Sequence, residues 1–154
     1  MTTAAISQTP ARGLEHERLS LFIGKWINEG YVVEGDGTPG ATILTSDIYE
    51  WVPGGFFVLH TAYGRIGDTD VGGVELIGFD PQREQYRSDF FDSLGNITTD
   101  SFDIRGDTCT WSGAQTRCSA VFTDHGKTQT AHHERLDETG RWVPAMEVVL
   151  TKVE

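Results

Sequence analysis

The stretch LSLFIGKWINEGYVV (residues 19–33) contains the point at which the character of the chain changes. Apolar residues cluster before Gly24 as in a short helix, and the residues after it are typical of an extended strand. Gly24 stands at the junction, where a residue that adopts a positive φ can end a helix. Trp26 follows inside the first expected strand, and its large side chain suits the closing of one end of a core. The stretch therefore predicts a short helix at 14–23 that leads into the first strand of a sheet.

From Trp26 onward, Gly, Asp, Pro and Asn separate short segments that are rich in β-branched and aromatic residues. Short turns between so many segments predict that sequential strands are antiparallel neighbours. No later segment has the pattern of a crossover helix, which excludes a parallel βαβ fold. We expect ten strands, at residues 26–34, 41–51, 56–63, 71–79, 85–91, 97–104, 108–112, 116–123, 127–136 and 142–152.

Closure is the natural way for a sheet of about ten strands to lose its edges. We therefore predict an all-β fold, a closed antiparallel up-and-down β-barrel with a short N-terminal helix. A β-sandwich is the competing architecture, but the meander order and the single leading helix favour the barrel. A barrel of this size leaves an interior that side chains do not entirely fill.

The length of 154 residues predicts a single domain, which we place at 14–154, after a disordered tail at 1–13. The 12 basic and 23 acidic residues give a net charge of −11, which repels nucleic acid and anionic membranes. The first residues lack the pattern of a secretory signal, and no apolar run is long enough to span a bilayer. The expectation is a soluble, cytoplasmic protein.

Two cysteines, Cys109 and Cys118, flank a segment with the pattern of a hairpin. If Gly113 and Ala114 form its two-residue turn, the cysteines lie directly opposite each other. A strained cross-strand disulfide and two reduced thiols packed as neighbours are both compatible with this register, and a reducing cytoplasm favours the thiols.

The Gly24-x-Trp26 motif at the first strand and Lys152 near the end of the last resemble the calycin superfamily, which contains lipocalins, fatty-acid-binding proteins and nitrobindins. That resemblance implies that Trp26 packs across the base of the barrel with the Lys152 cation over its ring. Further motifs resemble an uncharacterised bacterial domain-of-unknown-function family of lipocalin-like barrels. They are the segments 54–58 (GGFFV) and 78–81 (GFDP), Tyr86, and the segment 91–93 (FDS). The resemblance covers residues 14–152 and implies a ten-stranded barrel.

Nitrobindins, more distantly similar, hold haem through one histidine of the last strand. The corresponding segment 142–152 contains no histidine here, so haem is possible but disfavoured, and we expect no cofactor or metal.

Residues whose side chains could reach the lumen are candidates for binding a ligand. His132 and His133 are adjacent on one expected strand, so at most one of them faces inward. His60 shares its face with Val58 and Ala62, while Tyr63 lies on the other face, and both faces are partly apolar. The candidate ligand-binding residues are His60, Tyr63, Tyr86, Phe90, His132 and Met146, whereas Gly24, Trp26 and Lys152 are assigned to barrel closure. Asp92 and Ser93 fit a turn better than a catalytic pair.

The first functional hypothesis is a binding module that takes a small, largely apolar molecule in its lumen. The alternatives are a haem protein or enzyme that uses a lumen histidine, and a homodimer formed through an exposed apolar strand face. A catalytic residue is not assigned.

Overall fold

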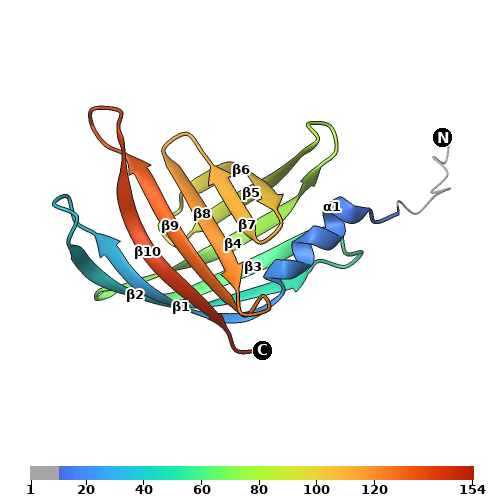
Figure 1. The fold of residues 1–154 in the computed structure, drawn as a ribbon, viewed down its shortest axis with the longest axis horizontal. Coiled ribbons are helices and arrows are strands. Elements are labelled where there is room, and N and C mark those ends of the chain that lie inside the picture. Colours follow the sequence, from blue (N-terminus) through green and yellow to red (C-terminus); the bar gives the residue numbers. More distant parts are fainter. Residues whose placement is uncertain (1–10) are drawn as a thin grey trace.

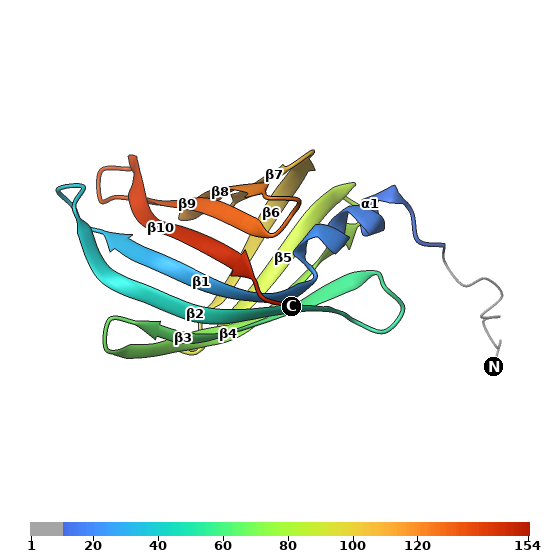
Figure 2. The ribbon, with the colours of Figure 1, turned by 60° about the horizontal axis from the view of Figure 1, so that its bottom comes forward.

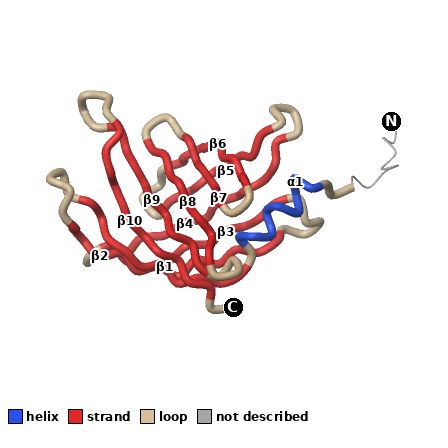
Figure 3. Tube along the Cα trace, in the orientation of Figure 1, coloured by secondary structure: helices blue, strands red, loops and turns tan. Residues whose placement is uncertain are grey.

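The structure is a computed structural model that describes residues 11–154. Ten antiparallel strands follow each other around one closed barrel, and β1 pairs with β10 to complete it (Figure 1). A single turn of α-helix and a 3-10 helix precede them (Figure 3). The elements are α1 (Leu14–Glu17), η1 (Arg18–Phe22), β1 (Gly24–Val33), β2 (Pro39–Trp51), β3 (Phe57–Ile66), β4 (Thr69–Asp80), β5 (Gln85–Asp92), β6 (Ile97–Arg105), β7 (Thr108–Ser112), β8 (Thr116–Thr123), β9 (Thr128–Leu136) and β10 (Trp142–Lys152).

The predicted fold class is confirmed, and all ten strands lie within about three residues of their expected bounds. The helix is a correction, because only Leu14–Glu17 is α-helical and the predicted helix continues as 3-10 turns to Phe22. Gly24 has a φ of +138° and opens β1. A Cβ at this position would lie 2.6 Å from the carbonyl oxygen of Glu154, so glycine is required by both backbone conformation and space.

Residues 11–13 adjoin the barrel, whereas the rest of the predicted tail, residues 1–10, lies outside the described residues. The Nε of Arg12 donates a hydrogen bond of 2.8 Å to the carbonyl oxygen of Gly55, and its guanidinium lies 4.7 Å from the centre of the Trp51 ring.

The two ends of the barrel differ. The helices lie at the end where β1 begins and β10 finishes, which we call the base (Figure 2). The β1–β2, β3–β4, β5–β6, β7–β8 and β9–β10 turns lie at the other end, which we call the open end. Phe22 of η1 packs into the base against the rings of Tyr49, Phe102, Trp111 and Phe122. The helical segment therefore serves as a plug of the base, while the other end of the barrel has no such helix among residues 11–154.

Trp26 closes the base as the resemblance implied. Its side chain is 1% exposed, and its Nε1 donates to the carbonyl oxygen of Phe22 at 2.9 Å. Lys152 is its partner in the β1–β10 register, with Nζ 4.9 Å from the centre of the indole. This cation–π contact joins the first strand to the last.

The β7–β8 hairpin differs in register from the prediction. Ser112 pairs with Arg117, so Ala114 and Gln115 form the turn and Cys109 lies opposite Ala120. Both cysteines are free thiols in this structure. The expectation that they lie directly opposite each other was wrong because the turn falls one residue later than predicted.

Candidate functional site

The lumen above the plug contains a cavity of about 330 Å³. This volume lies within the range of small-molecule sites. Much of its wall is apolar, supplied by Phe90, Trp111, Met146, Val148 and Leu150. Carboxylate, amide and imidazole groups also line it, so the lining of the cavity is largely apolar with a small number of polar groups.

Three strands place a charged cluster on one wall of this cavity. His60 lies on β3, between Asp47 of β2 and Glu75 of β4. Its Nε2 is 2.7 Å from Oδ2 of Asp47, and its Nδ1 is 2.8 Å from Oε1 of Glu75. The three side chains are 9%, 7% and 16% exposed, respectively. Thr45 donates its hydroxyl to the other oxygen of Asp47 at 2.5 Å.

The cluster fixes the charge of His60. Two carboxylate acceptors require two N–H donors, which only the doubly protonated ring supplies. Burial alone lowers the pKa of His60, but hydrogen bonds to Asp47 and Glu75 outweigh it and raise the pKa to about 9. The ring of Tyr49 stacks on the imidazolium, with centroids 4.0 Å apart and planes at 6°. His60 is therefore a cation held in place, with no free lone pair for a metal, a haem iron or a proton.

Other polar atoms of the lumen have no hydrogen-bond partner among the described residues. They are Oδ1 of Asn28, Oδ1 of Asp100 and Nε2 of Gln129. Gln129 is only 4% exposed. Burial, and next the charge of Glu75, raise the pKa of Asp100. A buried polar atom without a partner costs stability, and a group of them around one cavity is what a polar ligand would satisfy.

The second lumen histidine is His133 on β9, and its environment is unlike that of His60. Burial lowers its pKa, so it is neutral. Its Nε2 lies 3.6 Å from Sγ of Cys118, whose own pKa is raised by burial to about 12. This is a pair of neutral groups, unlike the thiolate and imidazolium of a cysteine nucleophile. A haem or catalytic role for a lumen histidine would fall to His133. The described residues contain no group of three or more His, Cys, Asp or Glu side chains that could hold a metal ion.

The six candidate ligand-binding residues divide between the cavity and other parts of the barrel. His60, Phe90 and Met146 line the cavity. Tyr63 does not, since it points outward and is 71% exposed. Tyr86 packs on Phe102 near the base and donates its hydroxyl to the carbonyl oxygen of Glu15.

His132 also points outward, where its Nδ1 contacts the carboxylate of Glu147, so the inward member of the histidine pair is His133. The placement of Tyr63 and His132 in the lumen was wrong, whereas Tyr86 is buried inside the barrel near the base and does not line the cavity.

The turn after β5 has the structural role that was predicted for Asp92. One oxygen of its carboxylate accepts hydrogen bonds from the backbone N–H groups of Leu94 and Asn96, both at 2.9 Å. The bond from Asn96 contributes most to lowering the pKa of Asp92. The carboxylate thus organises the β5–β6 turn at the open end.

The sequence interpretation missed the polar groups that distinguish this lumen: Asp47, Glu75, Asp100, Asn28 and Gln129. A signal for two of them was present in the alternation of the strands. Asp100 shares its face with Phe102 and Ile104, and Glu75 shares its face with Ile77 and Phe79. An acid at an apolar position of a strand predicts a carboxylate inside the barrel.

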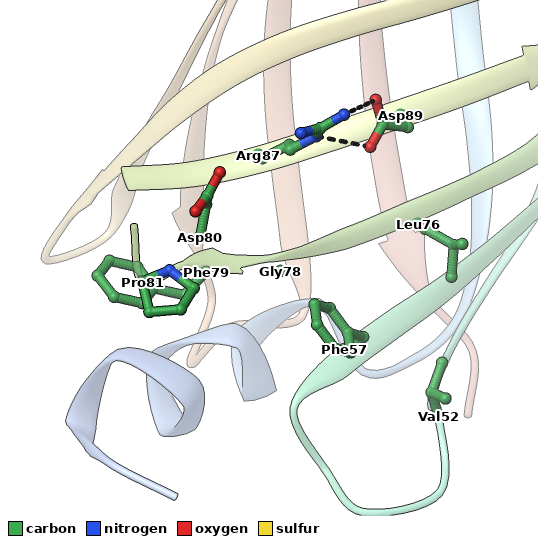
Figure 4. A pocket seen from close by; sticks show the side chains of 9 residues that line it. All are labelled: Val52, Phe57, Leu76, Gly78, Phe79, Asp80, Pro81, Arg87 and Asp89. Carbon is green, nitrogen blue, oxygen red and sulfur yellow. Dashed lines mark hydrogen bonds and ion pairs between the residues drawn. The ribbon is translucent and has the colours of Figure 1, made fainter. Parts of the chain in front are cut away.

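A second hollow, of about 450 Å³, lies on the outside of the barrel over β3, β4 and β5 (Figure 4). Phe57 lies across Gly78, where a Cβ would come within 2.2 Å of the ring, and Leu76 and Val52 complete an apolar floor. Arg87 and Asp89 form an ion pair beside it, with Nε 2.8 Å from the carboxylate. This hollow has more volume than the lumen cavity but offers no unpartnered buried polar atom.

Comparison with known proteins places the chain in a family. Residues 11–152 match the family described as "Protein of unknown function (DUF1579)". The chain belongs to this family. The crystal structure of Rv2717c from M. tuberculosis is similar to the DUF1579 barrel described here, with a TM-score of 0.66 and 13% identity over 94% of this chain and all of the other. At that identity the likeness concerns the fold. No curated protein matches the chain.

The family match confirms the resemblance to a domain of unknown function, and a calycin-like barrel agrees with the structure. Similarity to nitrobindins stays a prediction. Within residues 11–154, no helix is long and apolar enough to cross a membrane.

Proposed function

We propose that this protein binds a small molecule in the barrel lumen, with the apolar body of the ligand against the aromatic and aliphatic wall. The observation that carries the proposal is the coincidence of a cavity of about 330 Å³ with three buried polar atoms that lack partners. A lumen that served only as a core would be filled by side chains or would pair its polar groups. The ligand differs from the largely apolar molecule of the first hypothesis in having polar groups of its own.

The direct test fills the lumen. Ala131 lines the cavity and is 3% exposed, so Ala131→Phe places a ring in the space that the ligand would occupy. We expect uncharged N-phenyl-1-naphthylamine to gain fluorescence with the native protein and to bind Ala131→Phe at least about tenfold more weakly, a loss near 1.4 kcal/mol. Fluorescence titration gives both dissociation constants.

The matched control is Thr130→Phe, the same ring on the neighbouring residue of β9, which points away from the lumen. It should bind the probe as the native protein does. Equal loss in both variants would refute the proposal, and so would a native protein that binds neither this probe nor any small amine, alcohol or carboxylate tested beside it. Native mass spectrometry of freshly purified protein gives a second readout, since a retained ligand would be absent from Ala131→Phe.

We also propose that two copies associate through the outside of β2, β3, β4 and β5. Large apolar side chains on this outer apolar face are between 37% and 71% exposed: Leu44, Ile48, Phe57, Tyr63, Val74, Leu76 and Phe91. With a net charge of −11, two chains repel each other over most of their surface. The ion pairs beside the outer hollow, Arg87–Asp89 and Arg83–Asp80, each have no net charge, so they add little to that repulsion.

Sedimentation equilibrium over a range of concentrations tests the association. We expect a dimer for the native protein and a monomer for Leu76→Glu, which puts a charge in the centre of the outer apolar face. Leu94→Glu is the control, because Leu94 is 78% exposed but lies in the β5–β6 turn at the open end and not on a strand of that face. A native protein that is monomeric at all concentrations would contradict the proposal.

A further inference from the structure

The charges that reach the lumen are unbalanced. Asp47, Glu75 and Asp100 contribute three carboxylates, and His60 is the cation between two of them. The cluster of Asp47, His60 and Glu75 therefore has an excess negative charge, and Asp100 faces the same cavity without a partner.

Arg117 also borders the cavity, but its charge is already paired. Its Nε lies 2.9 Å from a carboxylate oxygen of Glu134, and its guanidinium lies 4.4 Å from the centre of the Trp142 ring. Lys152 lies over Trp26 at the base and does not border the cavity. Neither cation faces Asp100 within hydrogen-bond distance.

The groups around the cavity fit a hydrogen-bond donor with a positive charge. Oδ1 of Asp100 and Oδ1 of Asn28 are acceptors in need of donors. The faces of Phe90 and Trp111, which line the same cavity, are electron-rich and attract cations. Burial, and next the charge of Glu75, raise the pKa of Asp100, which is the direction expected for a carboxylate without a cationic partner.

We infer that the ligand has a protonated amine on a compact apolar body, and that Asp100 is the residue that receives the ammonium group. The inference rests on the proposed lumen-binding function and specifies its ligand class. An ammonium donates to Asp100 and Asn28, while the apolar body packs along Met146, Val148 and Leu150. The unpartnered Nε2 of Gln129 is a donor, so a hydroxyl or carbonyl elsewhere on the ligand completes the set.

Isothermal titration calorimetry at pH 7 with two matched series tests the inference: hexylamine, hexan-1-ol and hexanoate, and 2-phenylethylamine, 2-phenylethanol and phenylacetate. Within each series the body is shared and only the charge of the head group changes. We expect the amine to bind about ten- to a hundredfold more tightly than the alcohol, because a charge-assisted hydrogen bond contributes a difference in affinity of this size. The carboxylate should bind most weakly of the three.

Asp100→Asn should reduce the preference for the amine to within a few-fold of the alcohol and leave the affinity for the alcohol unchanged. Asp103→Asn is the matched control: it removes the same charge from the same strand, but Asp103 is 51% exposed and pairs with Arg105 outside the barrel. It should keep the native preference.

The outcomes separate this inference from the function on which it rests. Equal binding of amine, alcohol and carboxylate, or tighter binding of the carboxylate, overturns the amine assignment and leaves lumen binding intact. The same conclusion follows if N-phenyl-1-naphthylamine binds but neither hexylamine nor 2-phenylethylamine does. If neither the probe nor any of the six compounds binds, the lumen-binding function itself is refuted. An equal loss of preference in Asp100→Asn and Asp103→Asn would refute the role of Asp100.

Discussion

Replacing His60 by leucine should lower the free energy of unfolding by about 3–5 kcal/mol at pH 7, because it leaves two buried carboxylates without the cation between them. Asp47 and Glu75 are 7% and 16% exposed, so water compensates them poorly. Urea unfolding followed by circular dichroism measures the change. A loss below about 1 kcal/mol would contradict the assignment of His60 as a buried imidazolium.

His133→Leu is the matched control, since it removes the other lumen histidine. His133 is neutral and contacts Cys118 without a carboxylate partner, so an apolar replacement should be nearly neutral for stability. Restoring charge balance gives a further check. The double variant His60→Leu with Glu75→Gln should recover part of the loss, because one of the two orphaned charges is removed.

The same cluster gives the native protein a pH dependence of known sign. The pKa of His60 rises from 6.5 to about 9 on folding, so folding favours its protonated form. Its stabilising contribution, about 3 kcal/mol, is complete below pH 6.5 and is lost as the pH rises through 9. The loss between these values should be present in His133→Leu and absent from His60→Leu.

Trp26→Ala should cost about 3–5 kcal/mol, the usual cost of removing a large aromatic side chain from a core. The substitution removes a 1% exposed indole, its hydrogen bond to the carbonyl oxygen of Phe22 and the ring beneath Lys152. The affinity of the lumen for N-phenyl-1-naphthylamine should be unchanged under conditions in which the variant is folded, because Trp26 does not line the cavity.

Trp142→Ala makes the same chemical change at the opposite end of the barrel, where Trp142 is half-buried beneath Arg117. Its cost should be near 1 kcal/mol, the size of a cation–π contact at a partly exposed site. Thermal unfolding of both variants measures the contrast. An unchanged melting temperature for Trp26→Ala would show that the base is closed by other residues.

The fold could be predicted from the sequence because its signals are local. Each strand is bounded by residues that favour turns, and the G-x-W motif marks the base, so the ten strands and the Trp26–Lys152 contact follow without knowledge of the lumen. The β7–β8 register could not be fixed in this way, because moving the turn by one residue shifts the pairing of Cys118 from Cys109 to Trp111.

The site depends on contacts between side chains of different strands. Which side chains meet is decided by the pairing and register of the strands, and these cannot be read from the sequence of one strand. His60 meets Asp47 and Glu75 because β2, β3 and β4 are neighbours with a particular register. The orientation of the Tyr63 side chain was predicted wrongly because both faces of β3 contain apolar residues. The available signal was the position of the acidic residues Glu75 and Asp100 on apolar strand faces. Because side chains alternate along a strand, an acid on the apolar face points into the lumen.

The seam between β1 and β10 also sets the order in which a new chain can finish folding. During synthesis β1 is the first of the ten strands to emerge and its partner β10 is the last of them, and until then the sheet is open along β1 and β9. Such unpaired edges invite pairing with other chains. Lys152, Gly24 and the carbonyl of Glu154 meet at this seam, so the base can close only after β10 has been synthesised.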